Sequence, residues 1–208
     1  MILGVLFGII CLLSATAAGL GLIHINHGLY TVCLNRMDIP EISGYSKGEC
    51  IQNYDAVMEF LAPFNHEKFD LPTMTYSESG AQHFEDCRPL FNGVYLLGTI
   101  SLAIALISGP IAKRKFGAVF LKTSGITTIA VPSILLCAFA VDFNAAFVLF
   151  HKIFFSNDMW LFDPATDPII NILPEDFFLV CGVFIAVFWI LSAIIQLICS
   201  KRMKKDNV

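Results

Sequence analysis

The chain has 208 residues, of which 56% are hydrophobic and only 14% are charged, and its formal net charge is −4. Soluble domains carry roughly 25% charged residues, so this composition argues against a soluble globular protein. The lack of a basic excess also excludes a nucleic-acid-binding surface.

Four apolar segments are predicted to cross a membrane. They cover about residues 2–25, 91–112, 120–141 and 177–199, and each is close to the roughly 20 residues that a helix needs to span a bilayer. The sequence therefore predicts an all-α membrane protein, a four-transmembrane-helix bundle that forms a single integral membrane domain over residues 1–208. Its two large loops, 26–90 and 142–176, are expected to be extracytoplasmic and to contain short amphipathic helices.

The first span has an alternative interpretation as a cleaved signal peptide. The small residues Ala15, Thr16 and Ala17 fit a cleavage site. Against this alternative, no basic residue precedes the apolar run, and the run continues to Ile25. We therefore favour a retained membrane helix.

The distribution of charge orients the four spans. Residues 26–90 hold four basic and ten acidic residues, and residues 142–176 hold one basic and six acidic residues. By the positive-inside rule, the basic connection between the second and third spans and both termini face the cytoplasm. The basic residues on that side are Lys113, Arg114, Lys115, Lys122, Lys201, Arg202, Lys204 and Lys205.

The end of the first span carries two histidines, His24 and His27, on one helical face. Such a pair can bind a metal ion, but no third ligand follows at a recognised spacing. We therefore interpret both as residues of the membrane interface. Further along this first outer loop, Tyr30–Cys33 suggests a short extended piece, and Glu49–Leu61 predicts an amphipathic helix.

A second helix is predicted at the end of the first outer loop, where Ser77 or Ser79 is suited to cap its start. This helix carries His83 and Asp86 close to the second span. On spacing alone, His83 is interpreted as a solvated loop residue.

The second outer loop is the least ordinary part of the chain. Read as a helix, its first half places phenylalanines on one stripe and Asn144, His151 and Asp158 on a narrow polar stripe. Asp163-Pro164 and Asp167-Pro168 then predict turns, because a residue before proline is disfavoured in the helical region. The phenylalanines of the stripe are Phe143, Phe147, Phe150 and Phe154.

Three of the seven cysteines, Cys33, Cys50 and Cys87, lie outside the predicted spans. One disulfide bond is possible there, and whether Cys50 pairs with Cys87 stays open. The four cysteines within the spans are interpreted as small hydrophobic residues.

Common catalytic motifs are missing from the chain: it has no HExxH, Walker, GxSxG or CxxC pattern. What it does have is histidine beside carboxylates on the predicted outer face. An imidazole oriented by an acid or an amide can serve as a general base in acyl transfer. The many phenylalanines nearby favour a lipidic ligand.

The run FHKIFFSNDMWLFDPATDPIINILPEDFF (residues 150–178), together with AQHFEDCR (residues 81–88), resembles the bacterial lipoprotein intramolecular transacylase (Lit) family. The resemblance extends over nearly the whole chain, and the longer run carries the more specific landmarks. It implies a multi-pass protein of the bacterial cell membrane that acts on diacylated lipoproteins among membrane lipids. The implied reaction moves the sn-2 acyl chain of a diacylglyceryl-cysteine to the cysteine α-amine and gives a lyso-form lipoprotein.

The resemblance also implies site residues at the extracytoplasmic face. His83 and His151 are the expected acid and base, in an order left open, and no metal or cofactor is expected. Asn157 and Asp158 are candidates to orient His151 or to stabilise the oxyanion, and Asp86 to hold the His83 ring.

Two alternatives from other classes stay open. A metal-dependent membrane hydrolase would use the histidines and the outer acids as ligands. A non-enzymatic membrane module for lipid binding or complex assembly needs none of them. Asp163, Asp167 and Glu175 are interpreted as loop and cap residues because of their proline neighbours.

Overall fold

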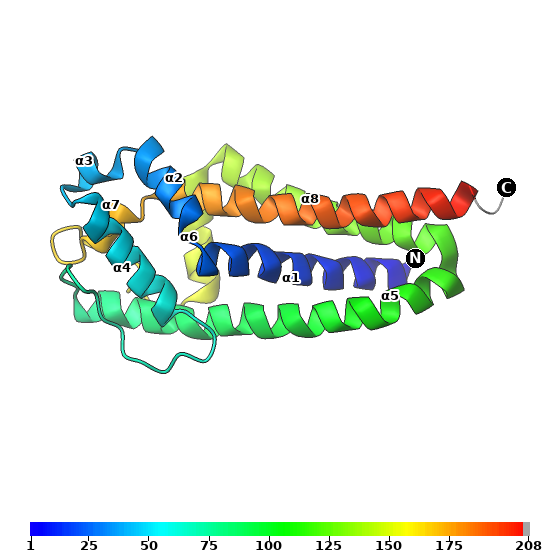
Figure 1. Ribbon diagram of the computed structural model, residues 1–208, viewed down its shortest axis with the longest axis horizontal. Helices are drawn as coiled ribbons and strands as arrows, with labels where there is room; N and C mark the ends of the chain where they lie inside the picture. The colour runs from blue at the N-terminus through cyan, green and yellow to red at the C-terminus, as the bar shows by residue number, and fades with distance from the viewer. Residues whose placement is uncertain (206–208) are drawn as a thin grey trace. The chain divides into compact units, whose positions relative to one another are not determined.

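The structure, a computed structural model, describes residues 1–205 and contains helices but no strand within that range. This confirms the predicted all-α class. The helices are α1 (Ile2–Ile25), α2 (Gly28–Arg36), α3 (Ile39–Ser43), α4 (Lys47–Phe60), α5 (Glu78–Val141), α6 (Phe143–Phe154), α7 (Ile169–Ile172) and α8 (Glu175–Lys205), as Figure 1 shows.

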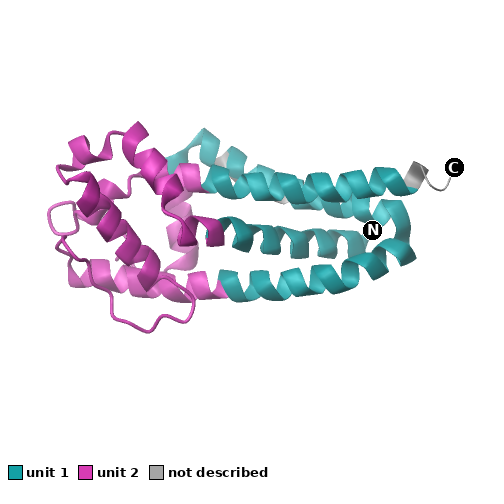
Figure 2. Ribbon diagram, in the orientation of Figure 1, with its two compact units in different colours: residues 1–20, 94–144, 182–208 teal, residues 21–93, 145–181 magenta. Residues whose placement is uncertain are grey.

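The described residues form two compact units, coloured separately in Figure 2. Unit 1 contains residues 1–20, 94–144 and 182–208, and unit 2 contains residues 21–93 and 145–181. Among the described residues, three helices are long and apolar enough to cross a membrane: Ile2–Ile25, Glu78–Val141 and Glu175–Met203. Unit 1 thus contains most residues of the long apolar helices, and unit 2 contains most residues of the two predicted loops.

In unit 1, helix α5 turns back on itself at Gly117, as Figure 1 shows in green. Gly117 has φ 69° and ψ −160°, which are not helical values. A residue with a side chain rarely adopts this conformation. The helix therefore consists of two helical segments, and the ranges 91–112 and 120–141 lie on either side of Gly117.

Small residues let α1 approach the second segment of α5 closely. A Cβ atom on Gly8 would lie 2.7 Å from the carbonyl oxygen of Ser124. A Cβ atom on Gly4 would lie 2.9 Å from the carbonyl oxygen of Phe120. Close backbone approach through small residues is the usual way in which helices associate inside a membrane.

A buried polar network joins three helical segments of unit 1. Gln196 in α8 receives a hydrogen bond from Ser124 and donates one to the Thr128 hydroxyl at 3.2 Å. Thr128 in turn donates to the carbonyl oxygen of Gly8 in α1 at 3.1 Å. Such bonds satisfy polar groups that the bilayer leaves without water.

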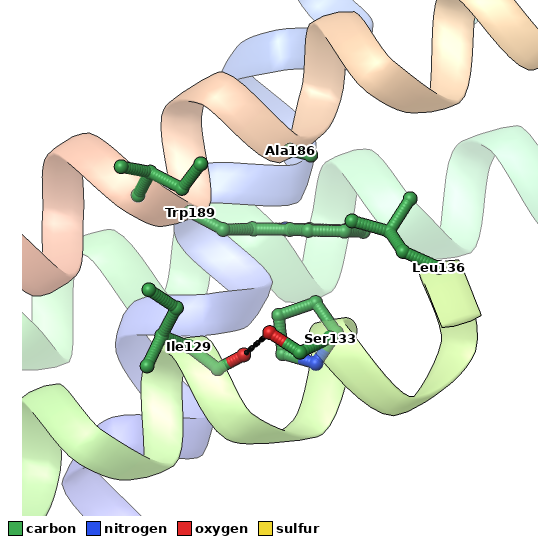
Figure 3. Close-up of a pocket in the computed structure, with 7 residues that line it drawn as sticks. Ile129, Ser133, Leu136, Ala186 and Trp189 are labelled. Carbon is green, nitrogen blue, oxygen red and sulfur yellow. Dashed lines mark hydrogen bonds between the residues drawn. The ribbon is translucent and has the colours of Figure 1, made fainter.

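Beside this network, a small apolar cavity of about 80 Å³ lies between α5 and α8 (Figure 3). Its walls include the indole ring of Trp189, whose Nε1 donates to Thr16 at 2.9 Å, and Ser133, whose hydroxyl donates to the carbonyl oxygen of Ile129 at 2.7 Å. The side-chain polar groups of Trp189 and Ser133 are therefore both bonded within unit 1. The cavity offers only a small apolar space.

The core of unit 2 is built from the predicted loops. Tyr30 of α2 stacks on Tyr54 of α4 with ring centroids 4.0 Å apart, and both rings meet the edge of Phe177. The Tyr30 hydroxyl donates to the carbonyl oxygen of Ile172. The predicted extended piece Tyr30–Cys33 is therefore wrong, because this segment is helical and buries Tyr30 and Cys33.

The predicted amphipathic helix Glu49–Leu61 is confirmed, although α4 begins two residues earlier. Ser46 forms a capping box with Glu49: the Glu49 backbone N–H donates to the Ser46 hydroxyl, and the Ser46 backbone N–H donates to the Glu49 carboxylate. This box moves the start of the helix to Lys47.

Helix α6 ends at Phe154, so the predicted helical stripe that includes Asp158 is wrong beyond that point. The carbonyl oxygen of His151 accepts the N–H of Phe155 at 2.8 Å where the helix ends. Residues 155–168 form bends, turns and irregular segments. Within α6, His151 is buried while Phe150 and Phe154 are exposed. Of the predicted polar stripe, only His151 is therefore buried, since Asn144 and Asp158 are exposed.

Candidate functional site

The segment that carries His83 is fixed at its start by a buried carboxylate. Asp167 is only 2% exposed and accepts hydrogen bonds from the Ser77 backbone N–H at 2.8 Å and from the Ser77 hydroxyl. Ser77 also caps α5 by accepting the N–H of Gly80 at 2.9 Å. Of the two predicted caps, Ser77 is therefore confirmed, and the interpretation of Asp167 as a loop and cap residue agrees with these bonds.

His83 lies six residues into α5 and is buried among aromatic rings, with 8% of its surface exposed. Phe155 and Phe162 lie 4.9 and 5.4 Å from its ring, centroid to centroid. The solvated interpretation of His83 is therefore wrong. Its Nε2 lies 3.6 Å from Cys87 Sγ, and its Nδ1 has no hydrogen-bond partner among the described residues.

His151 is 7% exposed, and its ring tautomer follows from its surroundings. Its Nδ1 lies 2.8 Å from the carbonyl oxygen of Phe147, one turn back along α6. A carbonyl oxygen only accepts, so Nδ1 carries the proton and Nε2 keeps a free lone pair. Trp160 stacks on the imidazole at 4.6 Å between centroids.

The two histidines face each other, with ring centroids 5.8 Å apart. The pKa of His83 is lowered to about 4, mainly by burial and to a smaller extent by the nearby His151, whereas Asp86 acts in the opposite direction. Burial also lowers the pKa of His151, with the Phe147 carbonyl opposing. Both rings are therefore neutral at neutral pH, which is the form that a base or a neutral hydrogen-bond donor requires.

Asp86 and Asn157 meet beside this pair. Asn157 Nδ2 donates to Asp86 Oδ2 at 2.8 Å, and Gln82 Nε2 donates to Asp86 Oδ1 at 2.8 Å. Asp86 acts on His83 through its charge, and its two carboxylate oxygens are bonded to these amides. Asn157 thereby links the segment after His151 to the helix of His83.

The other predicted polar residues lie apart from the histidine rings. Asp158 is exposed, and its backbone carbonyl accepts the N–H of Leu161. His27 forms an exposed contact of 3.4 Å with Asp55. Among residues 1–205, no group of three or more histidine, cysteine or acidic side chains is arranged to hold a metal ion. The seven cysteines are free, so Cys50 and Cys87 are not joined.

Comparison with known proteins identifies this arrangement. The model of the family described as "Lipoprotein intramolecular transacylase Lit" matches residues 2–178. The chain belongs to the Lit family. Lit is a transacylase, so the predicted acyltransferase class is confirmed, as is the predicted resemblance. No curated protein sequence gives a match.

Solved structures agree with this membership. The membrane-integral Lit of Bacillus cereus is 30% identical to this chain; the match covers 99% of this chain and 96% of that one, with a TM-score of 0.90. Two variants of that Lit, with one histidine replaced by arginine or by alanine, match with a TM-score of 0.85, covering 99% of this chain and 92% and 94% of theirs. A membrane location is therefore confirmed for this fold.

Sequence reasoning singled out His83 and His151 as candidates but missed most of their surroundings. Phe155, Trp160 and Phe162 come from an irregular segment whose path no helical period reveals. Cys87 was considered only for a disulfide, although its position four residues after His83 already places both on one helical face. That spacing was the available signal.

Proposed function

We propose that this chain moves the sn-2 acyl chain of a diacylglyceryl-cysteine lipoprotein to the α-amine of the same cysteine, giving the lyso-form. The observation that carries the proposal is the pair of neutral, buried histidines with facing rings, in a chain of the Lit family. Amine and ester belong to one substrate, so the site needs only to orient them and manage the proton. No cofactor or metal is needed for this step.

His151 is the proposed general base. Because its Nδ1 donates to the Phe147 carbonyl oxygen, Nε2 is the atom that is free to accept a proton from the α-ammonium. The amine nitrogen then bonds to the ester carbonyl carbon, and the bond from that carbon to the sn-2 oxygen breaks. His151 passes this first proton to water, then takes the second proton that the nitrogen must lose as the amide forms, and returns that one to the departing alkoxide. One proton, that of the starting ammonium, is released overall.

His83 is the proposed donor to the oxyanion. Its lowered pKa keeps the ring neutral, and a neutral imidazole can still donate one hydrogen bond. A Cys87 thiol that donates to Nε2 places the ring proton on Nδ1, the nitrogen without a partner. Burial raises the pKa of the Cys87 thiol to about 12, so the thiol keeps its proton.

The other predicted polar residues receive different roles. Asn157 and Asp86 hold the two histidine segments together through their hydrogen bond, and the Asp86 charge attracts the substrate ammonium. Asp158 is exposed, and we propose that it contacts the polar part of the lipoprotein.

The proposed topology follows from charge and from the two segments of α5. Each segment of α5 on either side of Gly117 forms one span, which with α1 and α8 gives four. Both termini then face the cytoplasm, and residues 26–90 and 142–176 face the outside of the bacterial cell membrane. Both units would belong to one integral membrane domain over residues 1–208.

The test is expression in a bacterium that makes diacylated lipoproteins, followed by tandem mass spectrometry of one N-terminal lipopeptide. We expect one acyl chain to move from glycerol to the amine without a change of mass. His151→Ala should abolish this product, whereas His66→Ala, which alters an exposed histidine, should leave it unchanged. Lyso-form product from a folded His151→Ala protein would contradict the proposal.

A further inference from the structure

Trp160 carries a buried polar group that the proton transfers described above do not use. Its side chain is 9% exposed. Its indole Nε1 is buried and has no hydrogen-bond partner among the described residues. A buried donor without a partner destabilises the folded protein, so its retention calls for an explanation.

Another such nitrogen, in the same cluster of aromatic rings, is Nδ1 of His83. Both groups belong to the same cluster, because His151 stacks on Trp160 and faces His83. By contrast, the other tryptophan, Trp189, has a bonded indole N–H, which donates to Thr16 in unit 1. Two unpartnered hydrogen-bond donors, Trp160 Nε1 and His83 Nδ1, therefore lie next to the proposed base His151. This arrangement indicates that the substrate supplies the acceptor.

We infer that the Trp160 indole N–H is a catalytic hydrogen-bond donor to the carbonyl oxygen of the sn-2 ester, and that it stabilises the oxyanion together with His83 Nδ1. This inference rests on the proposed function. The indole nitrogen has a donor and no acceptor, so it favours the oxygen of an ester over an ammonium group. Donors preorganised in a site without water stabilise developing charge far better than donors in water.

The inference assigns two functions to one side chain. The ring face of Trp160 packs on the imidazole of His151 and keeps the base in place. The ring edge carries the N–H. A substitution that keeps the ring but removes the N–H therefore separates the two functions.

The experiment replaces Trp160 with 3-benzothienylalanine, introduced at that codon alone, so that sulfur takes the place of the N–H in a ring of nearly the same shape. We expect kcat for lyso-form production to fall roughly 10²-fold, with KM and the thermal unfolding temperature close to those of the parent protein. An unchanged kcat would overturn the inference. Trp189→Phe is the matched control and should keep kcat.

A second measurement needs no substitution. A synthetic lipopeptide with a phosphonate in place of the sn-2 ester mimics the tetrahedral oxyanion. In protein with ¹⁵N-labelled tryptophan, its binding should shift the Trp160 indole N–H resonance downfield and leave that of Trp189 in place. Binding without this shift would overturn the inference. If the parent protein makes no lyso-form product at all, it is the proposed function that fails instead.

Discussion

Asn157 and Asp86 are 71 positions apart in the chain, and their side chains are joined by a hydrogen bond of 2.8 Å. Asp86 lies three residues after His83, and Asn157 lies six residues after His151. This bond is thus a direct polar link between the two segments that carry the histidines. The two rings lie 5.8 Å apart, centroid to centroid, and we expect this separation to depend on the link.

Asn157→Ala should therefore reduce lyso-form production by ~10²-fold, because a displacement of about 1 Å at a catalytic group has effects of that size. The measurement is the rate with a synthetic diacyl lipopeptide in detergent. Gln82→Ala removes the other amide bonded to Asp86 and leaves the link intact, so it should cost much less. Equal losses for the two variants would count against a linking role for Asn157.

The buried carboxylate of Asp167 gives a stability prediction. Asp167→Ala leaves the Ser77 backbone N–H without its acceptor, and such a loss costs roughly 1–3 kcal/mol. We expect a lower thermal unfolding temperature together with reduced activity, since the start of the His83 helix loosens. Asp163→Ala changes an exposed acid in the same loop and serves as the control; a drop of similar size there would point to a general effect of the loop.

The histidines of this site were predictable, whereas their neighbours were not. The resemblance to the Lit family identifies His83 and His151 as candidate site residues. The helical spacing of four residues then places Cys87 beside His83. Trp160 and Asp167 belong to the irregular residues 155–168. In such a segment, no helical or strand period predicts which way a side chain points. Their places depend on tertiary contacts such as those of Asp167 with Ser77, which leave no local pattern.

Tertiary contacts also explain why part of the fold was predicted wrongly from the sequence. Tyr30–Cys33 contains residues common in strands, but burial of Tyr30 against Tyr54 and Phe177 stabilises a helix there. Tertiary packing routinely overrides such local preferences. The turn at Gly117, by contrast, follows a basic connection that the charge pattern had placed between two spans.

Cys87 offers a test of the His83 tautomer. Cys87→Ser keeps a donor beside Nε2 and should preserve most activity, whereas Cys87→Ala removes the donor and should lower kcat several-fold, of the order expected for losing one neutral hydrogen bond. The ¹⁵N chemical shifts of the His83 ring report the tautomer directly. Cys33→Ala, a buried cysteine elsewhere in the same core, should leave those shifts unchanged. If Cys87→Ala also leaves them unchanged, the thiol does not set the tautomer.

The lowered pKa of His83 makes stability depend on pH. The folded ring has a pKa of about 4, against 6.5 for the unfolded chain, so between these values the unfolded state binds more protons. The stabilisation is therefore complete above about pH 6.5 and is lost as the pH falls toward 4. The total effect is on the order of 3 kcal/mol, and the lowered pKa of His151 acts in the same direction.

The groups that face His83 decide how this pH dependence responds to mutation. Asp86 and Cys87 lie on its own helix, and His151 lies on α6. Replacing Asp86 with Asn removes the charge that favours the protonated ring, so the pKa of His83 should fall further below its unfolded value. The loss of stability on acidification should then be larger, and the variant should unfold at a higher pH than the parent protein. The measurement is the thermal unfolding temperature of the parent protein and of the Asp86→Asn variant between pH 4 and 7.5. A third variant, His83→Phe, should lose most of the pH dependence of this temperature. A His83→Phe protein with the full parental pH dependence would show that other groups control acid unfolding.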